Sequence, residues 1–295
     1  MTTSSPSARP PWGVYAALLT QVLISAGTYL FAKRVLQELA PLTLLMCRFL
    51  LSGVLFAVLL VFAPRPRLPP RGAWAKVVTL GILACPVNQA TFFVGLSHSV
   101  PAHAALLYAL TPVGVFAYEL LRSHERASAR VLFGIVVAFA GVVVLLLGRG
   151  LGAAAGPLVG DLFLLVAVVS WVLYTAEGKG FIAEYGYFRA TAWTLLAGIL
   201  VSLPAAPFVL DIRAVQAASA VAWGGIVYLA ALTSVVSYFL WYYALGKLPA
   251  SRVAVFSNLQ PVATALAAWA LLGDPLTWEI AIGGALVIAG VRLAT

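Results

Sequence analysis

The sequence is poor in charged residues. Asp, Glu, Lys and Arg make up 9% of its 295 residues, whereas about a quarter of the residues of a typical soluble domain are charged. So little charge cannot cover a surface that faces water, which excludes a large soluble core, a disordered chain and a fibrous chain. An apolar content of 63% and a mean hydropathy of +1.03 indicate a chain that lies in a lipid bilayer.

Acidic residues and cysteines are especially scarce. Nine Asp and Glu stand against 18 Lys and Arg, a net charge of +9. In a soluble domain this excess would suggest nucleic acid, but no basic face with interleaved aromatic residues is open to water, so no nucleic-acid partner is expected. Cys47 and Cys85 lie inside apolar runs and are too few for a disulfide framework or a metal site. We therefore expect no metal and no cofactor.

Long apolar runs dominate what is present. A helix needs about 20 apolar residues to cross about 30 Å of hydrocarbon. Ten runs reach or approach this length: residues 12–32, 41–63, 74–96, 102–121, 131–147, 158–176, 188–210, 221–245, 253–272 and 278–294. The sequence therefore predicts an all-α integral membrane protein with ten transmembrane helices, whose short turns leave no room for an extramembrane domain.

The basic residues predict the orientation of these helices, because Lys and Arg collect in cytoplasmic segments. With the N-terminus in the cytoplasm, 13 of the 18 basic residues lie inside and four lie outside, while Arg48 falls within the second run. Both termini are therefore expected in the cytoplasm. The expected location is a bacterial-type inner (plasma) membrane, crossed many times.

A shift of 149 residues superimposes two parts of the chain without a gap. It places Leu110, Pro112, Gly134 and Gly141 on Leu259, Pro261, Gly283 and Gly290, and Glu125 on Asp274. Chance similarity would match Leu and Val more readily than Pro, Gly and acidic positions. Two units of five helices, 12–147 and 158–294, are joined by a linker at 148–157, so the second unit is inverted. Inverted repeats are typical of alternating-access transporters with a substrate site near the membrane midplane.

This repeated pattern resembles the EamA-type half of the drug/metabolite transporter (DMT) superfamily, whose members carry two five-helix copies. Within that superfamily the chain is similar to amino-acid exporters, in particular the YddG-type aromatic amino-acid exporters. Ser170, Trp171 and Tyr174 carry most of this closer match. Arg48 looks like the family's second-helix arginine, but no basic counterpart lies near Trp193 in the second unit. The resemblance implies a central cavity lined by the first, third, fourth, sixth, eighth and ninth helices.

Polar and aromatic residues gather near the centres of several runs, where an unpartnered polar group costs several kcal/mol. The candidate substrate-binding residues are Gln21, Asn88, Gln89, Tyr108, Thr111, Trp171, Tyr174, Ser234, Tyr238, Trp241, Asn258 and Gln260. Amides, hydroxyls and rings together suit a zwitterion with a hydrophobic or aromatic side chain. The alternative is that these groups only hydrogen-bond between helices and fill space.

Prolines and glycines recur at matched places in the two units. Pro112 and Pro261 stand mid-run, where each removes a backbone hydrogen bond and favours a kink. They are candidate hinges of a gate, or else fixed bends required for packing. The Gly134/Gly141 and Gly283/Gly290 pairs are each spaced by two turns on one face, which predicts close helix–helix packing.

Carboxylates are missing from the centres of the runs. Glu119 and Glu177 lie toward cytoplasmic ends and Asp161 near an external end. Pumps coupled to protons or sodium generally keep an acid at the midplane, so export without obligatory ion coupling is expected, with Glu177 the acid best placed to overturn this. Arg48 can snorkel, pair with a neighbouring helix or attract a carboxylate, and structural pairing is favoured.

Together these features predict a monomeric exporter of small solutes, most of all amino acids including aromatic ones, with the lipid bilayer as its only other partner. Efflux of other small metabolites or of cationic drugs is the alternative, although cationic drugs would call for a buried acid. An enzyme is not expected, because His98, His103 and His124 lack the spacing of a zinc site and no nucleophile motif is present. A receptor or structural role is disfavoured by the inverted repeat.

Overall fold

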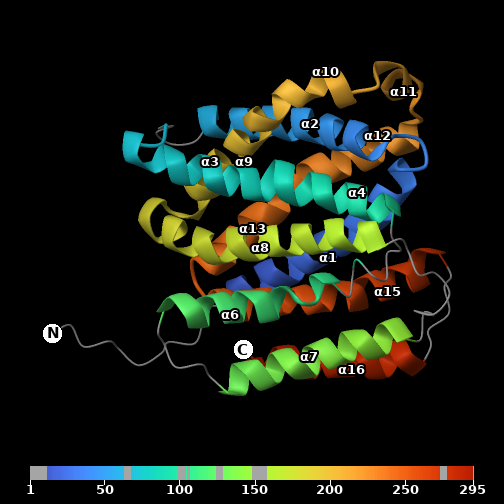
Figure 1. The fold of residues 1–295 in the computed structure, drawn as a ribbon. Coiled ribbons are helices and arrows are strands. Elements are labelled where there is room, and N and C mark those ends of the chain that lie inside the picture. The colour runs from blue at the N-terminus through green and yellow to red at the C-terminus, as the bar shows by residue number, and fades with distance from the viewer. Residues whose placement is uncertain are drawn as a thin grey trace.

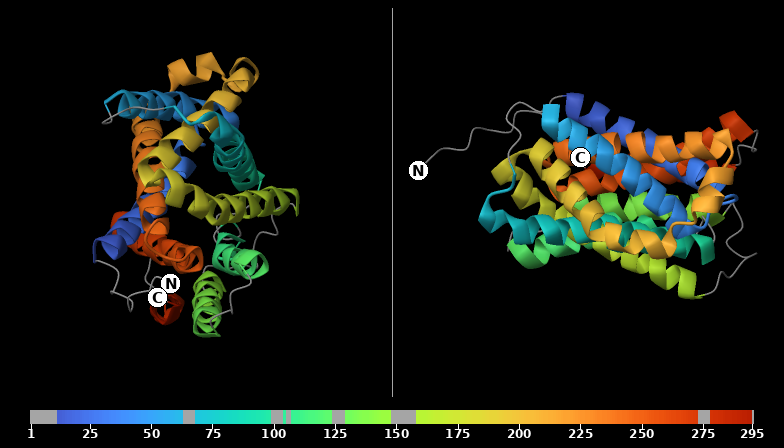
Figure 2. Two further views of the ribbon diagram at one scale, coloured as in Figure 1. Left: turned by 90° about the vertical axis from the view of Figure 1, so that its left-hand side faces the viewer. Right: turned by 90° about the horizontal axis from the view of Figure 1, so that it is seen from above.

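The computed structural model describes residues 12–62, 68–98, 104, 107–123, 129–147, 158–272 and 278–294. Within these ranges the chain is helical and contains no strand. The helices lie side by side as long rods in one bundle (Figures 1 and 2). The predicted linker at 148–157 and the residues His103 and His124 lie outside the described part of the chain.

The first half of the chain forms rods that are mostly continuous helices. They are α1 (Trp12–Val35), α2 (Pro41–Phe62), a rod of η1 (Arg71–Ala73), α3 (Trp74–Ile82), η2 (Leu83–Ala90) and α4 (Thr91–His98), then α6 (Thr111–Ser123) and α7 (Ala129–Leu147).

The second half repeats this order with more breaks. It consists of α8 (Leu158–Tyr185), a rod of α9 (Tyr187–Ser202), η3 (Leu203–Ala205) and α10 (Ala206–Val209), the short α11 (Ile212–Ala217), a rod of α12 (Ala220–Val227), η4 (Tyr228–Ser237) and α13 (Tyr238–Leu245), a rod of α14 (Ala250–Ala254), η5 (Val255–Asn258) and α15 (Leu259–Leu272), and finally α16 (Trp278–Ala294).

Helix occurs in every predicted range, and in the described residues six helices are long and apolar enough to cross a membrane. They are Trp12–Val35, Pro41–Phe62, Arg71–His98, Val159–Tyr185, Tyr187–Val209 and Ala220–Leu245. The total of ten spans and the cytoplasmic placement of both termini stay predictions. The prediction for 158–176 was too short, since α8 continues to Tyr185, and α11 was not predicted.

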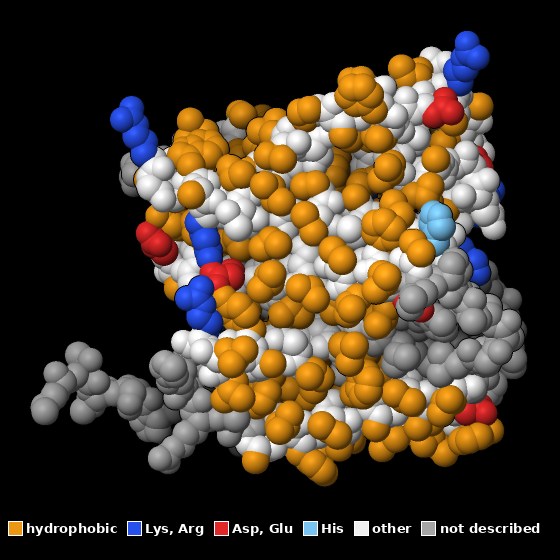
Figure 3. Space-filling model, in the orientation of Figure 1, with side chains coloured by type: hydrophobic (Ala, Val, Ile, Leu, Met, Phe, Trp, Pro, Cys, Tyr) orange, Lys and Arg blue, Asp and Glu red, His pale blue; other side chains and the backbone are white. Residues whose placement is uncertain are grey.

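The surface carries the pattern expected of a bilayer protein. On the face shown in Figure 3, Lys, Arg, Asp and Glu side chains lie at the two ends of the helices, and a hydrophobic band covers the middle. Large apolar side chains such as Leu23, Val54 and Leu200 are more than half exposed. In water such a surface would be an aggregation hazard, whereas in lipid it is the favourable one.

Glycines set the closest helix contacts, and the packing predicted for the repeated glycine pairs is confirmed. A Cβ at Gly134 would lie 2.7 Å from the backbone nitrogen of Ala294, and one at Gly141 would lie 2.6 Å from the carbonyl oxygen of Gly283. Gly290 meets the backbone of Ala138 in the same way. Helices α7 and α16 therefore touch backbone to backbone at one edge of the bundle (Figures 1 and 2).

Two rods contain a π-helical stretch at corresponding places in the two halves, η2 in the first and η4 in the second. Pro86 lies inside η2 and has no N–H to give to the preceding turn, so a wider turn relieves both the lost bond and the ring clash. In η4 the hydroxyl of Ser234 instead donates to the carbonyl of Leu229, 3.1 Å away. Such wide turns frequently mark functional sites.

The two candidate hinge prolines do not stand in the middle of a regular helix. Pro112 lies in the first turn of α6, after a turn at residues 109–110, and Pro261 lies in the first turn of α15, after the 3₁₀ stretch η5. A first-turn proline gives up an N–H that has no helical partner, so the break precedes each proline. The mid-helix kink that we expected is therefore absent at both prolines, and the hinge role stays a prediction.

Two carboxylates join the halves by capping helices. Glu38, in the turn after α1, accepts from the backbone nitrogen and the hydroxyl of Ser219, both at 2.9 Å, just before α12. These hydrogen bonds and the nearby Arg34 lower the pKa of the Glu38 carboxyl. Glu119 of α6 accepts from the backbone nitrogens of Ala250 and Ser251 at the start of α14, at 3.0 and 3.2 Å. Negative groups at helix N-termini are favourable.

Candidate functional site

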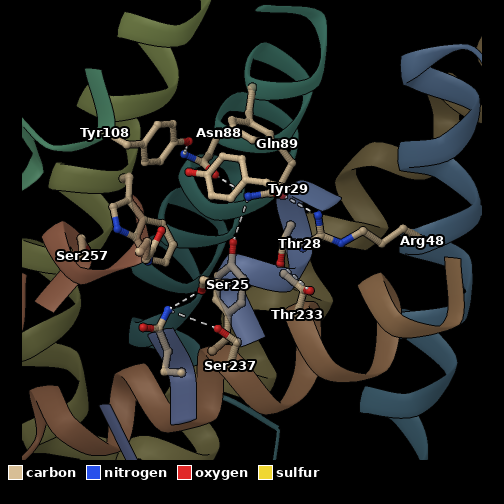
Figure 4. A pocket seen from close by; sticks show the side chains of 15 residues that line it. Ser25, Thr28, Tyr29, Arg48, Asn88, Gln89, Tyr108, Thr233, Ser237 and Ser257 are labelled. Carbon is tan, nitrogen blue, oxygen red and sulfur yellow. Dashed lines mark hydrogen bonds between the residues drawn. The ribbon is translucent and has the colours of Figure 1, made fainter. Parts of the chain in front are cut away.

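A polar cavity opens between the two halves, near the middle of the rods. It contains about 590 Å³ of empty space, including its open side. Its walls come from α1, α2, η2, α4, α8, η4, α13, η5 and α15, together with Tyr108 just before α6 (Figure 4). The lining side chains are Gln21, Ser25, Thr28, Tyr29, Arg48, Asn88, Gln89, Phe92, Tyr108, Trp171, Thr233, Ser237, Tyr238, Ser257 and Gln260.

Gln89 is the centre of the hydrogen-bond network on one wall. Its Oε1 accepts from Arg48 Nη1 at 2.7 Å, and its Nε2 donates to the Tyr238 hydroxyl at 3.1 Å and to Oδ1 of Asn88. Asn88 in turn donates to the carbonyl of Ala167 at 2.7 Å and to the Tyr108 hydroxyl at 3.2 Å. The π-helical η2 thus ties α2, α8, α13 and Tyr108 to one polar wall.

The opposite wall is built by α1 and η4. Gln21 donates to Ser25 at 2.8 Å and to Ser237 at 3.3 Å, while its Oε1 is buried with no partner in the described residues. The hydroxyls of Thr28 and Thr233 lie 2.8 Å apart. Short hydroxyl side chains here leave room for a ligand and offer both donors and acceptors to it.

Trp171 forms the aromatic floor of the cavity. Its ring meets Tyr238 edge to face at 5.4 Å, and its other ring neighbours are Tyr174 at 5.6 Å and Trp241 at 5.5 Å. Tyr174 stacks on Tyr242 at 4.9 Å and an interplanar angle of 16°. Trp171 and Tyr238 therefore face the cavity, and the rings behind them hold their positions.

The aromatic cluster is followed along α8 by a charged contact. Glu177 lies about 9 Å beyond Trp171 along the axis, at about 1.5 Å per residue. Its carboxylate pairs with Lys76 of α3, accepts from the Tyr118 hydroxyl and lies 3.1 Å from Arg122 Nη2 of α6. This ion cluster joins α3, α6 and α8 at that end of the rods.

Arg48 of α2 is buried deep in the bundle, with 2% of its surface exposed. Its Nε donates to the Ser234 hydroxyl at 2.6 Å and its Nη1 to Gln89 at 2.7 Å, and the guanidinium carbon lies 5.9 Å from the centre of the Phe93 ring. It lines the cavity and faces neutral groups there. The sequence favoured structural pairing for Arg48, and the neutral hydrogen bonds fit that expectation.

The structure brings most of the predicted site residues to the cavity. Those that line it are Gln21, Asn88, Gln89, Tyr108, Trp171, Tyr238 and Gln260. The others lie behind the walls. Ser234 is occupied by Arg48, Tyr174 stacks on Tyr242, and Trp241 donates to the Thr175 hydroxyl at 3.3 Å.

Thr111 and Asn258 are the remaining two predicted residues, and both are fully buried away from the lining. The hydroxyl of Thr111 and both amide atoms of Asn258 have no hydrogen-bond partner in the described residues. The direction in which each side chain points depends on the break before α6 and on the 3₁₀ turn η5, which a regular helical period does not foresee.

Several lining residues were not among the predicted ones: Ser25, Thr28, Tyr29, Arg48, Phe92, Thr233, Ser237 and Ser257. A signal was available for some of them. Ser25 and Thr28 lie one and two turns after Gln21 on the same face of α1, and Ser237 stands mid-run beside Tyr238. Thr233 and Ser257 carry no signal that would separate them from hydroxyls that only bond within their own helix.

Comparisons with known proteins match nearly the whole chain. The model of the EamA-like transporter family matches residues 11–147 and again residues 158–295. A protein of Archaeoglobus fulgidus named an uncharacterized transporter is 31% identical over 288 residues, which cover 94% of this chain and 96% of that protein. A Salmonella typhimurium protein named a probable amino-acid metabolite efflux pump is 26% identical, and the match covers 95% of this chain and 93% of that protein. One crystal structure shares the fold, with a TM-score of 0.79 at 21% identity and 96% coverage of both chains.

Proposed function

Because the chain belongs to the EamA-like transporter family, a family of multi-pass membrane transporters, we propose that it exports amino acids, including aromatic ones. The observation that carries the proposal is the cavity between the two halves, which amides and hydroxyls line together with the ring of Trp171. Amide and hydroxyl groups suit the polar end of an amino acid, and a ring suits an aromatic side chain. The name of the Salmonella relative agrees with this substrate class.

The proposed architecture has ten transmembrane helices in two inverted units, 12–147 and 158–294, with both termini in the cytoplasm of a bacterial-type inner membrane. The family model matches the chain twice, once in each unit, which supports two copies of one fold. Inverted units permit the cavity to open to either side in turn. In this arrangement the Glu177 cluster closes the cytoplasmic side, since it lies beyond the aromatic floor of the cavity. The transporter would act as a monomer.

Transport of phenylalanine tests the proposal directly. Purified protein in proteoliposomes is expected to take up radiolabelled phenylalanine with saturation, and to leave a quaternary ammonium dye untransported. The physical reason is that no described lining residue is acidic, so nothing in the cavity compensates a lone cation. Dye transport without phenylalanine transport would reject the amino-acid function and support cationic drug efflux, the runner-up.

A second experiment tests the absence of ion coupling. Exchange of labelled phenylalanine between vesicle and medium is expected to persist, at about the same rate, when pH and sodium gradients are collapsed by ionophores. No carboxylate among the described residues lines the cavity, and Glu177 is engaged by Lys76 and Arg122. Complete loss of exchange when the gradients are collapsed would refute uncoupled transport. Loss of exchange in Glu177→Gln, with exchange retained in the unaltered protein, would identify Glu177 as the coupling group.

A further inference from the structure

The cavity contains one full positive charge and, among the described residues that line it, no negative one. We propose that Arg48 is the receptor for a substrate carboxylate, so that the site takes small organic acids in general, and the substrate's amine is dispensable. This inference rests on the proposed transport function and names the chemical class of its substrates.

The hydrogen bonds of Arg48 leave part of its guanidinium available. Nε and Nη1 are used by Ser234 and Gln89, whereas Nη2 has no hydrogen-bond partner in the described residues. Figure 4 shows the guanidinium reaching into the cavity from α2, toward Gln89 and past Thr28 and Thr233. With Nε and Nη1 engaged, Nη2 is the nitrogen left to donate a charge-assisted hydrogen bond to a carboxylate.

The charge balance of the site also favours a carboxylate. A buried charge with only neutral partners costs several kcal/mol, and a charged partner with good geometry offsets that cost. Glu38 bonds Ser219, Glu119 caps α14 and Glu177 pairs with Lys76, and none of the described acids lines the cavity. The missing negative charge therefore arrives with the substrate.

The ammonium of an amino acid has no such counterpart. The other groups that line the cavity include the neutral amides, hydroxyls and rings of Gln21, Thr28, Tyr29 and Gln260. These groups can accept from an ammonium, but they give it only neutral hydrogen bonds, which are weaker than charge-assisted ones. A cation without a carboxylate would also be repelled by Arg48. Loss of the amine should therefore matter far less than loss of the carboxylate.

Three ligands of similar size separate the contribution of the carboxylate from that of the amine, measured on the unaltered protein in nanodiscs. They are phenylalanine, 3-phenylpropanoate, which lacks the amine, and phenethylamine, which lacks the carboxylate. Calorimetric affinities are expected to agree within about threefold for the two carboxylates and to be about 100-fold weaker for phenethylamine. Equal affinity for phenethylamine and 3-phenylpropanoate, or binding of neither carboxylate, would overturn the inference.

Variants place the effect on Arg48. Arg48→Gln is expected to weaken both carboxylates about 10- to 100-fold without weakening phenethylamine, and Arg48→Lys to restore part of that loss. Arg292→Gln, at an exposed arginine of α16, is the matched control and should leave all three affinities unchanged. If the Arg48→Gln protein fails to fold, the ligand series on the unaltered protein decides.

If 3-phenylpropanoate binds while phenylalanine is not transported, the amino-acid function fails and the inference stands. If phenylalanine is transported and Arg48→Gln binds it normally, the reverse holds.

Discussion

Transport of phenylalanine by Trp171→Ala is expected to fall about tenfold or more, while transport of alanine falls less. The indole is the aromatic face of the cavity, and it is held by Tyr174, Tyr238 and Trp241. Its removal deletes the ring that would contact an aromatic substrate and enlarges the site, so both stacking and apolar burial are lost. Initial rates of uptake of radiolabelled phenylalanine and alanine into proteoliposomes, for the variant and the unaltered protein, measure the two losses.

The matched control is Trp269→Ala. Trp269 belongs to α15, is 49% exposed and is not part of the cavity lining, so its loss removes the same side chain at the outer surface. Trp171→Phe keeps a ring at the site and should retain most of the phenylalanine transport. Equal losses in Trp171→Ala and Trp269→Ala would contradict the assignment of the cavity as the substrate site.

Gly290→Ala is expected to lower the free energy of unfolding by about 1–3 kcal/mol or more. A methyl group there would overlap the backbone of Ala138 and the carbonyl of Gly134, and neither side of the contact can move without separating α7 from α16. Alanine has a higher helix propensity than glycine, so propensity alone would stabilise the protein. The expected loss of stability is therefore opposite to the effect of helix propensity. Thermal unfolding in detergent, followed by loss of the monodisperse peak on gel filtration, measures the shift.

Gly224→Ala makes the same substitution where nothing lies within 4 Å of the new Cβ. It should be neutral or slightly stabilising, because only the helix propensity changes. A Gly290→Ala protein as stable as Gly224→Ala would mean that α7 and α16 do not touch backbone to backbone.

The length of the apolar runs predicted where the rods lie, but not where each one stops. The run at 158–176 was ended before Glu177, although the helix continues through this charged turn to Tyr185. The actual stop is Gly186, whose φ of 78° lies in the left-handed region that favours glycine. Charge marks the place where a rod leaves hydrocarbon, while backbone conformation marks the place where it ends.

Most of the candidate site residues line one cavity, but a regular helical period did not predict which way each side chain points. Ser234, Tyr238 and Trp241 were placed on one face by a regular helical period. The π-helical η4 ends just before Tyr238 and adds to the number of residues per turn, so a regular wheel drawn through it assigns the wrong faces. Ser237 consequently reaches the cavity while Ser234 turns to Arg48. That Nη2 of Arg48 is left free depends on partners from η2 and η4, and sequence spacing does not report contacts between rods.

The contact between α7 and α16 also has a consequence for biosynthesis. The ribosome makes α16 well after α7, so the glycine face of α7 lacks this partner until α16 has been inserted. Small residues give lipid little to pack against, and domains are generally completed in the order of synthesis. Insertion of α16 thus completes the packing of the first half as well as of the second, and a chain cut before Trp278 should leave both halves incompletely packed.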